Sequence, residues 1–208
     1  MAAFLGNLRN VVIASFILAL LLVILYASVQ GFDALYFELF TLRWLHVVAG
    51  IMWIGLLWYF NFVSTPTTPQ IPEELRPALG RYITPAALWW FRWSAMATIL
   101  LGIVLAYRND YLIEAYTLDL SQGLSGYPLG PKYLAIGIGM WLGTIMWFNV
   151  WFVIWPNQQK ALNIDGKYPD LAAAEKSAAA KTAGQFSRIN TLLSLPMLFS
   201  MIAAGHLY

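Results

Sequence analysis

Five apolar stretches in the chain are each long enough to cross the hydrocarbon core of a membrane, which takes about 20 residues in a helix. The stretches are Val11–Val29, Phe40–Val63, Pro85–Tyr107, Tyr133–Trp155 and Ile189–Leu207. Inside lipid, a backbone satisfies its own hydrogen bonds only as an α-helix or a closed barrel, and these stretches are too long for barrel strands. We therefore expect an all-α fold: a polytopic transmembrane helical bundle of about five helices, forming a single domain over residues 1–208.

The composition excludes several classes of function. Hydrophobic residues make up 60% of the chain and charged residues 11%, whereas soluble domains carry about 25% charged residues. The net charge of +2 and the lack of a basic stripe exclude a nucleic-acid partner. The chain contains no cysteine, so disulfides, iron–sulfur clusters, thiolate zinc sites and covalent c-type haem are excluded as well.

The basic residues predict the orientation of the helices. If the N-terminus lies on one side, the second–third and fourth–fifth connections lie there too. Nine of the 12 Lys and Arg residues fall on that side: Arg9, Arg76, Arg81, Arg92, Lys160, Lys167, Lys176, Lys181 and Arg188. The other side holds Arg43, Arg108 and Lys132. Basic residues favour the cytoplasmic side, so we expect a bacterial inner (cytoplasmic) membrane protein with a cytoplasmic N-terminus and a periplasmic C-terminus.

Two similar blocks of ten residues indicate an internal repeat. Residues 52–61 read MWIGLLWYFN and residues 140–149 read MWLGTIMWFN. Each block is followed by a proline and then by a return helix, which suggests a leading helix and two related hairpins. We expect Asn61 and Asn149 to form hydrogen bonds across helices, and the small pair Gly139 and Gly143 to allow close helix packing.

The connections differ in character. The proline-rich segment 64–84 is expected to be extended, with at most a short helix near Glu73–Gly80. Leu171–Ala183 is expected to be helical, with Asp170 as its cap and Gly184 as its stop. The outer connection Asn109–Pro131 is expected to be a solvated loop, with a docking surface as the alternative.

The only two histidines, His46 and His206, are the candidate functional residues. An ionisable group inside a membrane is costly and points to function. The topology places both near the outer face, at depths that agree to within about one helical turn. Imidazoles on two facing helices can hold the iron of a non-covalent haem b. Gly50, with Ala203 beside His206, would leave room for the ring, and Arg43 would pair with a propionate.

Other interpretations of the histidines stay open. A magnesium chlorin would need one imidazole, and an interfacial histidine with no cofactor is often only a hydrogen-bonded polar residue. Arg108 or Lys132 would serve as well as Arg43 for a propionate. The sequence contains no HExxH zinc motif, phosphate-binding loop, nucleophile elbow or Rossmann fingerprint. No catalytic residue is predicted.

A family resemblance rests on three segments. Residues 42–55 read LRWLHVVAGIMWIG, residues 90–93 read WFRW, and residues 203–206 read AAGH. They resemble the membrane domain of the bacterial membrane-bound urate oxidase (urate hydroxylase) family, most strongly over residues 40–107. The resemblance implies a membrane domain that oxidises a substrate and passes electrons to a cytochrome c. Members of that family carry more helices and a cytochrome c domain, and the Cys-x-x-Cys-His motif of such a domain is absent from this chain.

Two functional hypotheses follow. The first is a membrane redox protein with haem b between His46 and His206, which exchanges electrons near the outer face. The second is a non-catalytic accessory subunit of a larger respiratory or photosynthetic complex. The second is suggested by the few candidate catalytic side chains and the ten tryptophans. A channel or transporter is disfavoured because the five helices offer no obvious polar pathway.

Overall fold

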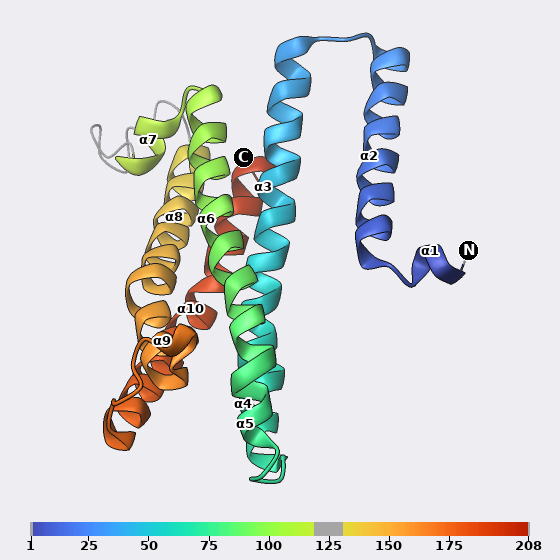
Figure 1. Ribbon diagram of the computed structural model, residues 1–208. Coiled ribbons are helices and arrows are strands. Elements are labelled where there is room, and N and C mark those ends of the chain that lie inside the picture. The colour runs from blue at the N-terminus through green and yellow to red at the C-terminus, as the bar shows by residue number, and fades with distance from the viewer. Residues whose placement is uncertain (1, 119–130, 208) are drawn as a thin grey trace. The chain divides into compact units, whose positions relative to one another are not determined.

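The computed structural model describes residues 2–118 and 131–207, and all regular secondary structure within these ranges is helical. Five of the described helices are long and apolar enough to cross a membrane, which confirms the expected all-α fold (Figure 1). They are Leu8–Gln30, Ala34–Gln70, Arg76–Arg108, Lys132–Leu162 and Ala173–His206. The chain divides into two compact units, residues 1–41 and 42–208.

The first unit contains α1 (Ala2–Leu5) and α2 (Leu8–Gln30). α2 begins at Leu8 because the Asn7 side chain accepts hydrogen bonds from the backbone N–H groups of Arg9 and Asn10, at 3.0 and 3.4 Å. It ends at Gly31, whose φ of 84° breaks the helix. No residue of α2 is buried.

The first hairpin is built from two long helices. The outgoing helix contains α3 (Ala34–Trp58), the π-helical η1 (Tyr59–Ser64), α4 (Thr65–Thr67) and η2 (Thr68–Gln70). The return helix contains α5 (Arg76–Ala78), the π-helical η3 (Leu79–Ile83) and α6 (Thr84–Arg108). The short α7 (Leu112–Tyr116) follows. It lies in the connection expected to be a loop, and residues 119–130 of that connection lie outside the described ranges.

The second hairpin repeats this plan. Its outgoing helix contains α8 (Pro131–Phe148), the π-helical η5 (Asn149–Ile154) and α9 (Trp155–Leu162). The short η6 (Ile164–Gly166) leads to the return helix α10 (Ala173–His206). Each outgoing helix also contains a π-helical segment that overlaps the end of its block, η1 in the first and η5, two residues later in the alignment, in the second.

In residues 2–118 and 131–207 there are three π-helical segments, and each ends two residues before a proline: Pro66, Pro85 or Pro156. A proline has no N–H, and its ring collides with the carbonyl four residues earlier in a regular α-helix. Here the residue before each proline donates its N–H to the carbonyl five residues earlier, as Thr65 does to Phe60. The wider turn lets the helix pass the proline, so the expectation of an extended segment directly after residue 64 is wrong.

The expected helix over residues 171–183 is present, but its expected cap and stop are wrong, because it is continuous with the expected fifth helix over residues 189–207. α10 begins at Ala173, where the Glu175 carboxylate accepts the Ala172 N–H at 3.2 Å, so Asp170 is not the cap. The helix runs through Gly184 without a break. A glycine ends a helix when it adopts a positive φ, and Gly184 is not among the residues that do.

The core of the second unit is shared by all four of its long helices. Its buried side chains are Trp53, Ile54, Leu57, Leu88, Phe91, Ala95, Met146, Val150, Ile154, Ala183 and Met197. The expected hydrogen bonds across helices are present: Asn61 donates to Ser187 Oγ at 2.8 Å, and Asn149 donates to Asn190 Oδ1 at 2.8 Å. Both repeat blocks are therefore held to the same face of α10.

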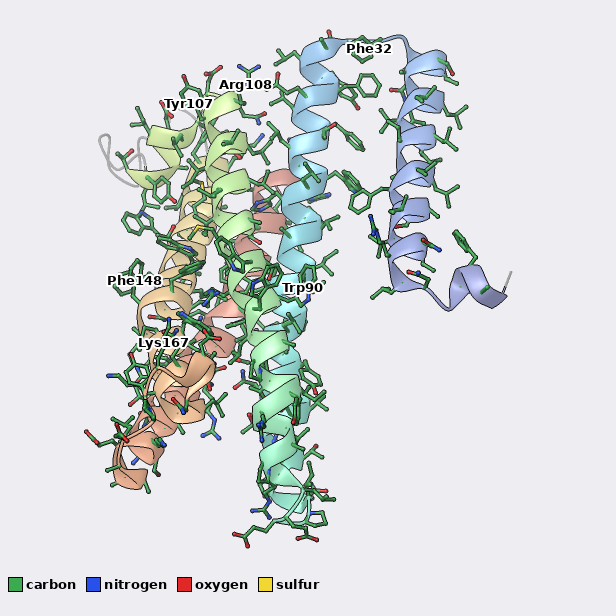
Figure 2. All side chains as sticks on the ribbon, viewed as in Figure 1. Phe32, Trp90, Tyr107, Arg108, Phe148 and Lys167 are labelled. Carbon is green, nitrogen blue, oxygen red and sulfur yellow. The ribbon has the colours of Figure 1, made fainter. Side chains whose placement is uncertain are left out.

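Large apolar side chains cover much of the outside of the helices (Figure 2). Trp90 and Phe148 are 55% and 51% exposed, and Phe148 projects away from the bundle in Figure 2. Such a surface is unfavourable in water and favourable against lipid. The exposed surface and the helix lengths agree with a membrane protein.

Candidate functional site

His46 lies on α3 and faces α6. Its Nδ1 lies 2.9 Å from the backbone carbonyl oxygen of Thr98. A carbonyl oxygen only accepts hydrogen bonds, so Nδ1 is the donor and carries the ring proton. In the neutral ring, Nε2 then carries a lone pair, which is the state in which a histidine binds a metal ion.

Gly102, one turn after Thr98 on α6, lets the imidazole approach. A Cβ atom at Gly102 would lie 2.9 Å from His46 Cε1 and 3.2 Å from Nδ1. Only a glycine fits this approach without displacing the ring. Sequence reasoning missed Thr98 and Gly102, because a threonine and a glycine four residues apart are ordinary in membrane helices and carry no distinctive signal.

Gly50 lies one turn after His46, and on the α6 side it has room for a methyl group. A Cβ atom there would meet only Thr98 Cγ2, at an ordinary 3.9 Å. Arg43 lies almost one turn before His46 and is exposed. Three of the predicted site residues, His46, Gly50 and Arg43, therefore lie on consecutive turns of α3.

Tyr111, beside α7, interacts electrostatically with Arg43. Burial raises the pKa of the Tyr111 hydroxyl above its ordinary value; the Arg43 charge lowers that pKa, and Tyr133 raises it. The Tyr111 and Tyr133 rings lie 6.0 Å apart, centroid to centroid. The α7 segment, which the sequence did not distinguish from a loop, thus contributes to the surroundings of Arg43.

His206 lies in the last turn of α10 and is exposed. Its Nδ1 lies 3.2 Å from the carbonyl oxygen of Ile202 in the same helix, so in the neutral tautomer that makes this bond the lone pair is on Nε2. A Cβ atom at Gly205 would meet nothing within 4 Å. Ala203 is 5% exposed and packs into the bundle, so the open space next to His206 is at Gly205.

The relation between the two histidines is one of location. His46 lies midway along α3 and His206 in the last turn of α10, and the C-terminal end of α10 lies toward the end of the bundle that holds α7 (Figure 1). The structure brings His46 together with Thr98 and Gly102. Among the described residues, the imidazoles of His46 and His206 each bond to a backbone carbonyl and not to one another.

Arg92 stands out at the other end of α6. Its guanidinium lies 3.7 Å from the ring centroid of Trp155 and 5.1 Å from that of Trp151. Trp151 in turn donates to the Arg92 carbonyl at 3.2 Å. This stack joins α6 to η5 and α9, and we assign it a structural role. The sequence segment WFRW contains Arg92, but nothing in it identifies tryptophans 59 and 63 residues later as its partners.

Comparison with known proteins shows a similarity that covers the second hairpin. The urate oxidase N-terminal family matches residues 129–207, which include η5, α9 and α10. The resemblance was expected to be strongest over residues 40–107, and the match falls outside that range. No curated protein and no solved structure matches the chain. Residues 129–207, which end just after His206, are thus similar to a urate oxidase N-terminal region.

Proposed function

We propose that the chain is an integral membrane redox protein in which His46 would hold haem b, and that it exchanges electrons near the outer face of the membrane. The observation that carries the proposal is the hydrogen bond from His46 Nδ1 to the Thr98 carbonyl. In metal-binding histidines, the ring nitrogen that does not bind the metal commonly donates its N–H to a carbonyl. This bond fixes the ring orientation and increases the basicity of the ligand nitrogen.

The other residues fit this role. His206 has the same tautomer as His46, so its Nε2 would be the second ligand. Arg43 is exposed near His46 and would pair with a propionate. Haem supplies one-electron transfer when bound. The residues of the chain do the positioning: Thr98 orients the imidazole, and Gly102 sets its distance from α6.

The family match supports a redox role and a partner. Residues 129–207 are similar to the N-terminal region of a urate oxidase, and an oxidase must pass electrons onward. We propose a cytochrome c, or a larger membrane complex, as the acceptor at the outer face. A magnesium chlorin on His46 alone would give a protein without iron, which separates this alternative from haem b.

The test is haem retention in the purified full-length chain. Protein from cells supplied with haem should show the absorption bands of b-type haem, and His46→Ala should lose them while the helical circular dichroism stays unchanged. His206→Ala should retain less haem or show an altered spin state. Full haem retention in His46→Ala would overturn the assignment of the ligand.

A specific observation favours the second candidate function, an accessory subunit. α2 is an apolar helix of 23 residues, and it belongs to a compact unit separate from the four-helix unit, so it is a candidate for binding a partner subunit within the membrane. This candidate expects copurification of the chain with a membrane complex, and loss of that complex when residues 1–31 are removed. A cofactor-loaded chain that turns over alone would count against it.

A further inference from the structure

Two adjacent cavities lie among the helices that carry η1, η3 and η5. The larger has a volume of about 250 Å³ and is bordered by η1 and η3, and the smaller has about 160 Å³ and is bordered by η1, η5 and α10. They share Phe60, Ser64 and Thr84 in their walls. π-Helical segments are frequent at functional sites, and all three in the described residues border these cavities.

The wall of the smaller cavity contains several polar side chains. The hydroxyls of Ser64, Thr65 and Thr84 and the amide of Gln158 make no side-chain hydrogen bond to any described residue. Hydroxyls in helices commonly bond to a carbonyl one turn earlier, as Thr68 does to the Ser64 carbonyl at 2.7 Å. Hydrogen-bond donors are therefore available to a ligand at this cavity.

The charge of the walls favours an anion. Among the described residues, no Asp or Glu borders either cavity, and each cavity is bordered by one arginine. Arg76, at the larger cavity, already donates to the carbonyls of Ile71 and Pro69 at 2.8 and 2.9 Å. Arg188, at the smaller cavity, makes no hydrogen bond or ion pair with a described residue. Its guanidinium is free to bind a carboxylate through two parallel hydrogen bonds.

The rest of the smaller cavity is apolar. Phe60, Leu88, Phe91 and Ile154 form this part of its wall, and Phe91 and Ile154 are only 2% and 3% exposed. Drug-sized ligands occupy pockets of about 300–1,000 Å³. A cavity of about 160 Å³ thus suits a small molecule with one charged end and a short apolar body.

We propose that the smaller cavity binds a small organic carboxylate. The carboxylate lies on Arg188 and the neighbouring hydroxyl and amide donors, and its apolar body lies against the Phe60 and Phe91 side of the wall. The site lies away from the histidines, toward the other end of the second unit, and uses none of the residues proposed to hold haem. A failed test of one proposal therefore leaves the other proposal unaffected.

Benzoate is the probe, titrated by calorimetry or saturation-transfer NMR against the purified full-length chain in detergent. Benzamide has nearly the same shape without the charge, and we expect it to bind at least tenfold more weakly. We expect Arg188→Gln to weaken benzoate binding by roughly 10- to 100-fold, the usual range for a lost charge-assisted hydrogen bond. Arg81→Gln is the matched control, because Arg81 is exposed and borders neither cavity, and should bind benzoate as the wild type does.

A second pair of variants tests the space inside the smaller cavity instead of the charge in its wall. Gly184 borders the smaller cavity, and a Cβ atom there would meet nothing within 4 Å. Gly184→Leu should therefore fold normally and abolish benzoate binding. Gly55→Leu is its control, since Gly55 also has open space and borders neither cavity. Equal benzoate affinity in all four variants, equal affinity for benzamide, or no benzoate binding by the wild type would each overturn the proposal.

Discussion

At the scale of single residues, the neighbouring helix decides which nitrogen of His46 can bind a ligand. The Thr98 carbonyl accepts from Nδ1, so Nε2 is left with the lone pair. Gly102 makes this contact possible, because any larger residue would displace the ring. The position of His46 on α3 was evident in the sequence. The tautomer was not, since it depends on a backbone atom 52 residues away.

Gly102→Ala tests this arrangement. The added Cβ would lie 2.9 Å from His46 Cε1, so the ring must shift and the Nδ1 hydrogen bond must weaken. We expect haem affinity to fall about 10- to 100-fold, as for other changes to groups that orient a metal ligand, and stability to fall by about 1–3 kcal/mol from overpacking. Haem titration of the apoprotein and thermal unfolding measure the two effects.

Gly55→Ala is the matched control, because its added Cβ meets nothing within 4 Å. This variant should bind haem with wild-type affinity. An unchanged haem affinity in Gly102→Ala would show that the contact between His46 and α6 does not position a ligand.

At the scale of helices, the prolines and glycines had to be placed in three dimensions before their effect was clear. Pro66 and Pro156 are markers of helix ends in a sequence, yet both helices continue past them through a π-helical turn. Gly184 likewise fails to end α10. Asn61 and Asn149 were predicted correctly, because a polar side chain inside a membrane needs a partner on another helix. The identities of those partners, Ser187 and Asn190, were not predictable from local sequence.

The packing of α7 against α8 leads to a prediction about the pKa of Tyr111. A Cβ atom at Gly137 on α8 would collide with the Ala115 carbonyl oxygen, so Gly137→Ala should displace α7 and expose Tyr111. Burial raises the pKa of Tyr111, and exposure should bring that pKa back toward about 10. Ultraviolet titration of tyrosinate, assigned with Tyr111→Phe, measures the shift.

The sign of the linked stability follows from the same pKa. The folded state holds the Tyr111 proton more tightly than the unfolded state, so docking of α7 is fully stable below pH about 10 and weakens as the pH rises toward the folded-state pKa. Gly143→Ala on the same helix is the control, because its Cβ would meet only Ile99 Cδ1 at 3.9 Å. Identical titrations of Tyr111 in both variants would show that Gly137 does not hold α7 in place.

At the scale of the whole molecule, the number of long apolar helices was predictable from the sequence, but the contacts between these helices were not. Length and hydropathy alone gave the five helices. The core of residues 42–208 depends on contacts among four helices that are distant in sequence, such as Trp58 Nε1 with Ser194 Oγ at 3.0 Å. The two cavities arise from the same long-range packing, so no local pattern identified them.

The predicted orientation of the chain is testable because the protein has no cysteine. Single cysteines at Asp110 and Lys167, both exposed in connections, provide unique labelling sites. The excess of Lys and Arg predicts that Asp110→Cys reacts with a membrane-impermeant maleimide in intact cells, and that Lys167→Cys reacts only after lysis. The opposite labelling pattern would reverse the topology and place both histidines at the cytoplasmic face.

The most direct test of the central claim, that this membrane protein holds a haem iron on its histidines, is the iron content and spin state of the wild-type chain. Metal analysis with electron paramagnetic resonance of the oxidised protein measures both at once. Ligation by His46 and His206 predicts one iron per chain in a six-coordinate, low-spin state. A fully folded, iron-free protein that fails to bind added haem would contradict the account.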